Sequence, residues 1–344
     1  MILILKNSAK KQEIDLFIEE IKSKGLGVHV SKGVDQTILG LLGDTSKLDP
    51  QDFLVNDVVE NVERVSAPYK LASRSFHPEN TVVVVGEGQS GVISCPIGDK
   101  KIVPVIAGPC AVESEEQFMQ AAIAVKKAGA RLLRGGAYKP RTSPYSFQGL
   151  GPEGIKILEK AKKETSLPIC TELMSVSQLK YFENVDLIQV GARNFQNYDL
   201  LKELGKTGKP VLLKRGLCGT IQELLMSAEY IISNGNDKVI LCERGIRTYD
   251  NYTRNCLDVS AVPYLHKVSH LPVVIDPSHA CGIRWMVPIL AQSAVAVGAD
   301  GLEIEVHCNP EKAVSDASQQ LTPEQFGQMC DKLSKYAAVE GKTL

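Results

Sequence analysis

Hydrophobic residues in the first part of the chain recur with two different periods. Four short apolar runs predict strands, at residues 2–6, 28–30, 37–42 and 58–65. Apolar residues spaced three or four positions apart predict two helices, at residues 11–24 and 50–55. The resulting order, βαββαβ, is that of a ferredoxin-like α+β domain. We therefore expect a small domain over residues 1–66, whose thin core favours pairing with a second copy or another domain.

From residue 101 the pattern changes to β-rich runs that alternate with amphipathic stretches. Eight strands are predicted, at residues 104–107, 131–133, 169–172, 187–190, 211–214, 239–243, 273–276 and 302–306. Helical stretches lie between them, for example at residues 115–128, 153–163, 220–233 and 286–297. Eight such units predict a TIM (β/α)8 barrel over residues 101–344. An open doubly wound sheet is the alternative, but no glycine-rich dinucleotide fingerprint follows the first strand.

The stretch between these two domains follows neither pattern. Residues 66–82 contain two prolines and several polar residues, which is typical of a linker. Residues 81–85 and 91–95 are β-rich and predict a short hairpin. We therefore expect residues 67–100 to form a linker and a hairpin that belong to neither domain.

The composition is that of an ordinary globular protein, with 344 residues, 44% of them hydrophobic and 23% charged. A formal net charge of −1 argues against nucleic acid or an anionic membrane as a partner. Nine cysteines, an odd number without a Cys-x-x-Cys pair, argue against disulfides and favour a reducing cytoplasm. No apolar run approaches the ~18 residues of a membrane span, and the N-terminal run is too short for a signal peptide.

Cations and hydroxyls are concentrated directly after the second predicted barrel strand. Arg134, Lys139 and Arg141 are followed by Thr142 and Ser143, and two glycines in the same stretch allow a ligand to approach the backbone closely. The planar fork of arginine matches the oxygens of phosphate and carboxylate groups, and lysine adds a point charge. A small anionic ligand fits this segment, and a solvated basic loop is the alternative.

Later strands also end in cations. Arg193, Lys214 with Arg215, and Arg244 with Arg247 follow the fourth, fifth and sixth predicted strands. The carboxyl ends of the strands of a TIM barrel carry the active site. Repeated cations at these ends therefore predict one anion-binding site.

The first, seventh and eighth strands end in residues that bind metals. Cys110 ends the first strand, His279 follows the seventh, Glu305 ends the eighth, and Asp316 lies eleven residues beyond Glu305. These strands are neighbours in a closed barrel, so the four side chains can surround one divalent cation. Mixed sulfur, nitrogen and oxygen ligands suit Mn²⁺, Fe²⁺, Co²⁺ or Zn²⁺ better than Mg²⁺ or Ca²⁺. A buried, unliganded Cys110 and a general-base role for His279 remain open from the residues alone.

Two further residues on the eighth strand share the parity of Glu305. His307 should point into the barrel mouth, either as a metal ligand or as a hydrogen-bonding neighbour of one. Glu303 lies one layer deeper, where a carboxylate needs a cationic or hydrogen-bonding partner. The sequence does not indicate which residue that partner is.

Seven of these segments together resemble one enzyme family. They are residues 108–110, 134–144, 191–194, 213–216, 242–245, 276–279 and 304–307. The chain resembles 3-deoxy-D-arabino-heptulosonate 7-phosphate (DAHP) synthases of the type Iβ branch across residues 100–340. Its N-terminal unit resembles the ACT-like regulatory domain of some members. The resemblance implies a cytoplasmic transferase that condenses phosphoenolpyruvate with erythrose 4-phosphate and water, giving DAHP and phosphate in the first step of the shikimate pathway.

The resemblance also implies roles for individual residues. Phosphoenolpyruvate would be held by Arg134, Lys139, Arg193, Lys214 and Arg244. Erythrose 4-phosphate would contact Arg141, Thr142 and Ser143, and we also count Asp276 and Ser278 among the substrate-binding residues. Cys110, His279, Glu305 and Asp316 match the four metal ligands of the family. Lys139, Glu172 and His279 are the catalytic candidates, with Glu172 and Lys139 placing water or moving protons.

Two other functions compete with this one. The sister enzyme that makes 3-deoxy-D-manno-octulosonate 8-phosphate from arabinose 5-phosphate shares the barrel, but it carries a different sequence at residues 139–143. A metal-independent version of that enzyme would need asparagine in place of Cys110. A phosphosugar-binding regulator on an inactive barrel is the third hypothesis, and the retention of every catalytic motif disfavours it.

The N-terminal domain is expected to bind an aromatic amino acid, tyrosine or phenylalanine, and to inhibit the barrel. His29 and Ser31 flank a turn at a strand end and could hydrogen-bond a polar ligand. An ordinary exposed strand residue is the alternative for His29. The expected assembly is a homotetramer or homodimer in which two regulatory units clamp over the barrel mouths.

Overall fold

The computed structural model describes residues 1–33, 36–45, 48–64 and 68–344. These residues form two compact units, one of Met1–Asn80 with Lys267–His270 and one of Thr81–His266 with Leu271–Leu344. The predicted domain boundary at residues 66 and 67, and the predicted strand end at residue 65, lie outside the described residues. No helix within the described ranges is long and apolar enough to cross a membrane.

The N-terminal unit is a four-stranded antiparallel sheet with two helices. Its elements are β1 (Ile2–Leu5), α1 (Lys11–Ser23), β2 (Gly27–Lys32), β3 (Thr37–Leu42), α2 (Gln51–Leu54) and β4 (Val59–Glu63). The strand order β2-β3-β1-β4 is the ferredoxin-like arrangement, so this prediction is confirmed. Phe17 and Ile21 of α1 are buried against Leu3 of β1 and Leu39 of β3, as the helical spacing requires.

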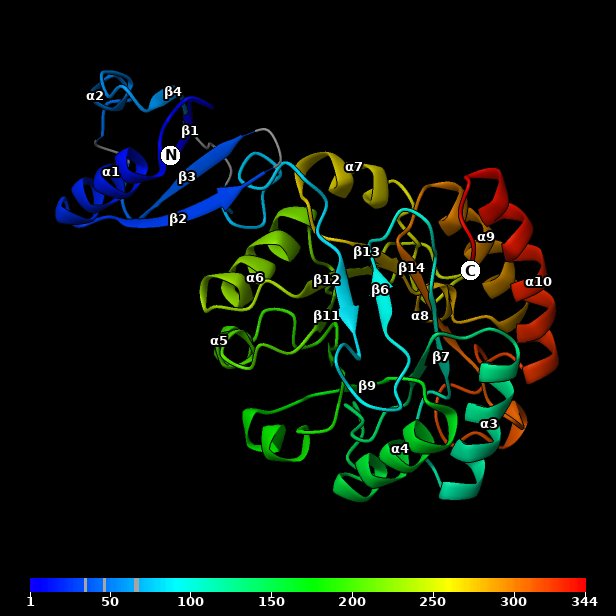
Figure 1. The fold of residues 1–344 in the computed structure, drawn as a ribbon. Helices are drawn as coiled ribbons and strands as arrows, with labels where there is room; N and C mark the ends of the chain where they lie inside the picture. The colour runs from blue at the N-terminus through cyan, green and yellow to red at the C-terminus, as the bar shows by residue number, and fades with distance from the viewer. Residues whose placement is uncertain (34–35, 46–47, 65–67) are drawn as a thin grey trace. The chain divides into compact units, whose positions relative to one another are not determined.

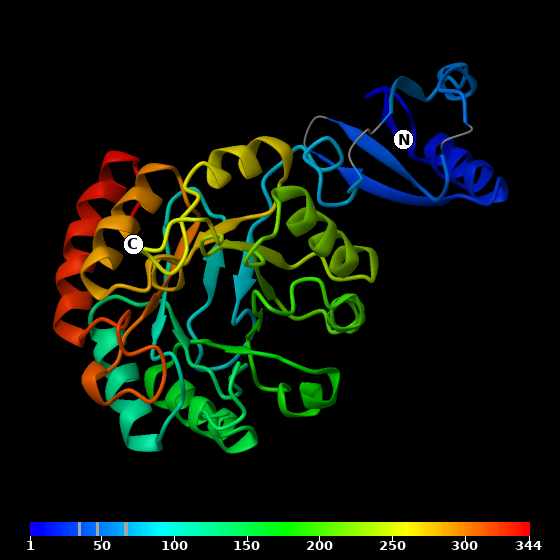
Figure 2. The same cartoon turned by 180° about the vertical axis from the view of Figure 1, so that it is seen from behind.

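The second unit contains eight parallel strands that close into a barrel, which confirms the predicted TIM fold. The strands are β7 (Val105–Gly108), β8 (Leu132–Arg134), β9 (Ile169–Glu172), β10 (Leu187–Val190), β11 (Val211–Lys214), β12 (Val239–Glu243), β13 (Val273–Ile275) and β14 (Gly301–Glu305). Figures 1 and 2 show the helices as a ring around these strands.

Most strands are followed by an α-helix, but the elements after β9 and β13 are irregular. The ring helices are α3 (Glu115–Lys127), α4 (Pro152–Thr165), α5 (Tyr198–Gly205), α6 (Ile221–Ser233), α7 (Ala261–Val268), α9 (Val287–Ala296) and α10 (Pro323–Val339). A 3₁₀ helix, η1 (Val176–Tyr181), follows β9. The short α8 (Pro277–Cys281) and the 3₁₀ helix η2 (Arg284–Met286) precede α9, and η3 (Pro310–Lys312) follows β14.

A short hairpin covers the amino-terminal ends of the barrel strands. Its strands β5 (Val83–Val85) and β6 (Cys95–Ile97), cyan in Figure 1, pair antiparallel. Their buried side chains pack with inward-facing residues near the starts of the barrel strands, such as Leu132, Leu187 and Val274. The hairpin therefore fills one end of the barrel and leaves the carboxyl ends of the strands for the site.

Strand register decides which side chains reach that end. Glu303 lies beside Ile106 and Glu305 beside Gly108, so both carboxylates face the barrel interior. A Cβ at Gly108 would lie 2.1 Å from the carbonyl oxygen of Arg134, so only glycine allows β7 and β8 to approach this closely. This close approach places Cys110, just after β7, beside the end of β8.

Candidate active site

A cavity of about 480 Å³ opens at the carboxyl ends of the barrel strands. Seven cationic side chains line it: Lys139, Arg141, Arg193, Lys214, Arg244, Arg247 and Arg254. Two carboxylates, Glu172 and Asp316, line it as well. The excess of positive charge, in a protein whose net charge is −1, makes this cavity a site for small anions.

Two buried cations, Arg134 and Lys214, are neutralised by carboxylates, and we call them the floor cations; Lys214 lines the cavity and Arg134 does not. Arg134 pairs with Glu305 and, through Nε, with Glu303 Oε1 at 3.2 Å. Lys214 Nζ lies 2.5 Å from Asp276 Oδ2 and 2.9 Å from Glu303 Oε2. Burial alone lowers the pKa of each cation, but the adjacent carboxylates outweigh it and raise both pKa values.

Four arginines of the cavity have no such partner; we call Arg141, Arg193, Arg244 and Arg247 the wall arginines. No carboxylate in the described part of the chain forms an ion pair with any of them. Arg244 is 3% exposed and donates only to backbone carbonyls, those of Gly245 at 3.2 Å and His279 at 3.1 Å. Burial lowers the pKa of Arg244, yet an arginine stays charged. The wall arginines therefore offer unneutralised charge to an anion.

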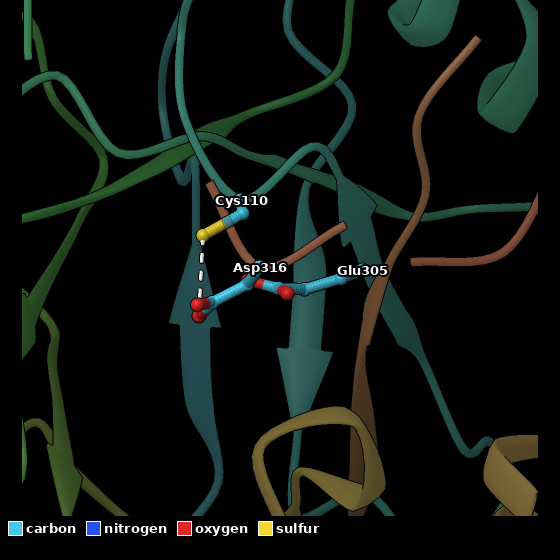
Figure 3. Close-up of side chains that lie close together, drawn as sticks. All are labelled: Cys110, Glu305 and Asp316. Atoms are coloured by element: carbon cyan, nitrogen blue, oxygen red, sulfur yellow. Dashed lines mark hydrogen bonds between the residues drawn. The ribbon is translucent and has the colours of Figure 1, made fainter. Parts of the chain in front are cut away.

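Beside the cations lies a cluster of potential metal ligands. One ligand atom from each of Cys110, Glu305 and Asp316 lies within 4.8 Å of the other two, as Figure 3 shows. Cys110 Sγ is 3.6 Å from Asp316 Oδ2. His279 Nε2 lies 3.4 Å from Glu305 Oε1 and 3.9 Å from Asp316 Oδ2. The structure thus brings all four predicted ligands together.

The chemistry of this donor set fits a divalent transition metal. His279 Nδ1 lies 2.6 Å from Asp276 Oδ2, and this bond leaves Nε2 as the acceptor that faces the cluster. Burial, and then Glu305, raise the pKa of the Cys110 thiol to about 12. A bound cation would reverse that effect, because metals bind the thiolate. It would also relieve the repulsion between Glu305 and Asp316.

Glu172 presents a buried carboxylate to the cavity. Its Oε2 accepts a 3.4 Å hydrogen bond from Gln189, and its Oε1 has no hydrogen-bond partner among the described residues. A Cβ at Gly191 would lie 1.9 Å from Oε1, so a larger residue at that position would displace the Glu172 carboxylate. Glu172 therefore lines the cavity with one carboxylate oxygen buried and without a hydrogen-bond partner among the described residues.

Comparison with known proteins assigns this arrangement to a family. Residues 81–339 match the DAHP synthetase I family, which covers most of the chain. The chain belongs to the DAHP synthetase I family. Residues 1–67 also match the DAHP synthase ferredoxin-like domain. The protein is therefore an enzyme of the DAHP synthase type.

Individual relatives agree with this assignment. The chain is 46% identical to phospho-2-dehydro-3-deoxyheptonate aldolase of Thermotoga maritima over 342 residues, which is 99% of each chain. A crystal structure of the Thermotoga maritima DAHP synthase covers 99% of this chain and 98% of its own, with a TM-score of 0.77. A 2-dehydro-3-deoxyphosphooctonate aldolase of Syntrophobacter fumaroxidans is 34% identical over 67% of this chain and 85% of its own.

Most residues that the resemblance assigned to the substrates line the cavity. These are Lys139, Arg141, Thr142, Ser143, Arg193, Lys214 and Arg244. Arg134, Asp276 and Ser278 do not line it, and all three are buried. Asp276 holds Lys214 and His279, while Ser278 Oγ accepts a 3.0 Å hydrogen bond from the backbone N–H of Glu305. The side chains of Asp276 and Ser278 therefore orient other site residues.

Two further residues of the site are His307, whose role the sequence left open, and Arg254, which the sequence did not indicate. His307 lies 3.3 Å from Glu113 and accepts a hydrogen bond from the Asn309 N–H, so it stands outside the ligand cluster. Arg254, which was not predicted, donates to Asp316 at 3.0 Å. It comes from the polar stretch between β12 and α7, where no hydrophobic period points to a function.

The predicted effector residues lie in the N-terminal unit, on β2. His29 is exposed, and the centroid of its ring lies 4.8 Å from that of Phe76 in the same unit. Ser31 is 8% exposed and pairs with Ile38 of β3. The two side chains lie on the same face of the strand, as their spacing requires.

Proposed function

We propose that the cavity condenses phosphoenolpyruvate with erythrose 4-phosphate and water, releasing DAHP and inorganic phosphate in the cytoplasm. The observation that carries the proposal is the location of the four wall arginines beside the cluster of Cys110, His279, Glu305 and Asp316. Two phosphates and one carboxylate need several unneutralised cations, and the aldehyde needs an electrophilic centre. This condensation opens the shikimate pathway to the aromatic amino acids.

The two substrates would occupy different depths of the cavity. Phosphoenolpyruvate would bind Lys139, Arg193 and Arg244 above the floor cations. Erythrose 4-phosphate would bind Arg141, Thr142 and Ser143 nearer the opening, where the hydroxyl residues are exposed. Arg141 donates to Ser315 Oγ at 3.0 Å, and that oxygen lies 3.2 Å from Cys110 Sγ. Arg141 therefore lies near the ligand cluster, as a residue that holds the aldehyde substrate should.

A divalent ion, Mn²⁺, Fe²⁺, Co²⁺ or Zn²⁺, would be held by Cys110, His279, Glu305 and Asp316. When bound it supplies a Lewis acid that polarises the aldehyde oxygen. Asp276 fixes the ring of His279 so that Nε2 faces the cluster. Lys139 Nζ lies 3.0 Å from Cys110 Sγ and is 7% exposed, so it can both hold an anion and supply a proton.

The bond changes of this reaction require the protein to position a water molecule and to move a proton. C3 of phosphoenolpyruvate forms the new carbon–carbon bond with the aldehyde carbon, and water adds to C2. Cleavage of the C2–O bond then releases phosphate, so atoms and charge balance. Glu172, which lines the cavity, would accept a hydrogen bond from that water, and Lys139 would move a proton.

A phosphate-release assay tests this function. Phosphoenolpyruvate is supplied with erythrose 4-phosphate or with arabinose 5-phosphate, each with and without EDTA. We expect phosphate to be released when phosphoenolpyruvate is paired with erythrose 4-phosphate but not with arabinose 5-phosphate. EDTA should abolish this release. Phosphate release mainly with arabinose 5-phosphate would support the octulosonate alternative, whose relative from Syntrophobacter fumaroxidans is 34% identical to this chain. No phosphate release with either sugar would support a non-catalytic regulator.

We further propose that the N-terminal unit regulates the barrel by binding tyrosine or phenylalanine. The match of residues 1–67 to the DAHP synthase ferredoxin-like domain supports this, and so does the position of His29 and Ser31 on one face of β2. The ring of His29 lies beside that of Phe76, and such a pair of rings suits an aromatic ligand. Inhibition would act through two regulatory units that pair within a homodimer or homotetramer.

A further inference from the structure

Glu303 is a buried carboxylate that the proposed reaction does not use. It belongs to β14, faces the barrel interior one layer below Glu305, and is 0% exposed. A carboxylate in such a place is costly unless cations compensate its charge. Cations must therefore lie next to Glu303 for the barrel to tolerate it.

Each oxygen of Glu303 faces a different floor cation. Oε1 lies 3.2 Å from Nε of Arg134, on β8, and Oε2 lies 2.9 Å from Nζ of Lys214, on β11. Neither contact has hydrogen-bond geometry, so attraction between the charges is the main interaction. Glu303 therefore links two strands across the barrel through Lys214, which lines the cavity, and Arg134, which does not.

The floor carries more negative than positive charge. Arg134 and Lys214 face three carboxylates, those of Glu303, Glu305 and Asp276. Glu305 would serve a metal and Asp276 orients His279, so both have other tasks. Glu303 contacts only the two cations among the ion pairs of the described residues, so its effect is to offset their charge.

We propose that Glu303 is a positioning residue that acts as an internal counter-ion, holding Arg134 and Lys214 in place and weakening the grip of the cavity on phosphate groups. The inference rests on the proposed function, because it takes this cavity as the phosphoenolpyruvate site. An anion that enters the cavity competes with Glu303 for Lys214, which lines it. Glu303 thereby keeps the floor ordered when the cavity is empty and allows inorganic phosphate to leave.

The test compares the phosphate affinity of the full-length, metal-loaded protein with that of Glu303→Gln, using inorganic phosphate as the probe in calorimetry. The amide keeps the size of the side chain and removes its charge. We expect the variant to bind phosphate roughly tenfold more tightly, since an opposing buried charge is gone. Phosphate should also raise its melting temperature more than that of the parent, because the anion replaces the missing counter-ion. KM for phosphoenolpyruvate and kcat should fall together.

Asp186→Asn is the matched control. Asp186 is also a buried counter-ion, 2.6 Å from Lys162 Nζ, but it does not line the cavity. Its loss should lower the melting temperature without changing the affinity for phosphate. A purely structural Glu303 would behave in the same way, and this result would overturn the inference.

Glu303→Asp covers the case in which the glutamine variant does not fold even with phosphate present. Aspartate keeps the charge but withdraws it from both cations, so we expect a smaller gain, about threefold, in phosphate affinity. Unchanged or weaker binding would contradict the inference. Arg244→Ala separates it from the proposed function: if that change leaves phosphate binding intact, the cavity is not the anion site and the proposed function fails as well.

Discussion

The floor cations and the wall arginines carry the same charge at the same end of the barrel, but their surroundings differ. Arg134 and Lys214 are almost fully buried, and they are held by two carboxylates of β14 and by Asp276, which directly follows β13. Arg193 and Arg247 are exposed, and Arg244 donates only to backbone carbonyls. The floor is therefore organised before any ligand arrives, whereas the wall is completed by the ligand.

This contrast separates two costs of an anion site. A buried cation needs a counter-ion for the fold to be stable, and that counter-ion reduces its attraction for a substrate. An unpaired cation attracts the substrate strongly but adds little to stability. Substitutions in the floor and in the wall should consequently affect different measurements.

Loss of the metal should have the largest effect on turnover and should leave the wall intact. Cys110→Ala, or treatment with EDTA, should lower kcat by more than about 100-fold, because a direct ligand is lost. Phosphate binding at the wall arginines should change little. Assays of phosphate release and of phosphate binding check both expectations, and full activity of the metal-free enzyme would falsify the metal assignment.

A floor substitution should destabilise the fold. Lys214→Met leaves Glu303 and Asp276 with one cation fewer in a buried site, so we expect a loss of about 3–5 kcal/mol of unfolding free energy. Urea denaturation measures it. If Lys214→Met were as stable as the parent, the floor would not differ from the wall in the way described.

A wall substitution should leave the fold unchanged and weaken the substrate. Arg193→Ala removes an exposed cation, so the unfolding free energy should stay within about 0.5 kcal/mol. KM for phosphoenolpyruvate should rise roughly 10- to 100-fold, the range of one or two charged hydrogen bonds. A large drop in stability with an unchanged KM would reverse the two assignments.

Arg141→Ala tests whether the wall distinguishes the substrates. Only erythrose 4-phosphate would lose the guanidinium fork, so its KM should rise about tenfold more than that of phosphoenolpyruvate. Steady-state kinetics with each substrate varied in turn give both constants. Equal rises in the two constants would count against the separate positions.

Removal of residues 1–66 should have the smallest effect on the cavity, because neither the floor nor the wall contains a residue of that segment. We expect turnover within about threefold of the parent and no response to tyrosine. Retained inhibition by tyrosine would place the effector in the barrel.

Sequence periodicity was sufficient for the barrel strands and for the direction of their side chains, but the second hairpin strand, predicted at residues 91–95, is β6 at Cys95–Ile97. The parity of β14 correctly placed Glu303 beneath Glu305, because alternation along a strand is a local property. Its partners could not be predicted, since Arg134 and Lys214 come from strands far apart in the sequence. Which residues meet inside a barrel depends on strand stagger and closure.

The same limit explains the residues that were missed or assigned to another role. Arg254 reaches Asp316 from a loop without any hydrophobic period, so no sequence pattern marks it. Asp276 and Ser278 belong to a segment rich in site residues, but α8 begins immediately after Asp276 and turns both side chains toward their neighbours. Composition indicates that such residues are near a site, and only packing shows which of them face the ligand.

The hairpin of β5 and β6 bears on the order in which ligands bind in the cavity. Because it fills the amino-terminal end of the barrel, any ligand of the cavity must enter and leave through the mouth at the opposite end. In the proposed arrangement, phosphoenolpyruvate would lie deeper than erythrose 4-phosphate and would have to enter first. We expect an ordered kinetic mechanism as a result, so that a sugar phosphate bound too early blocks the enzyme until it departs.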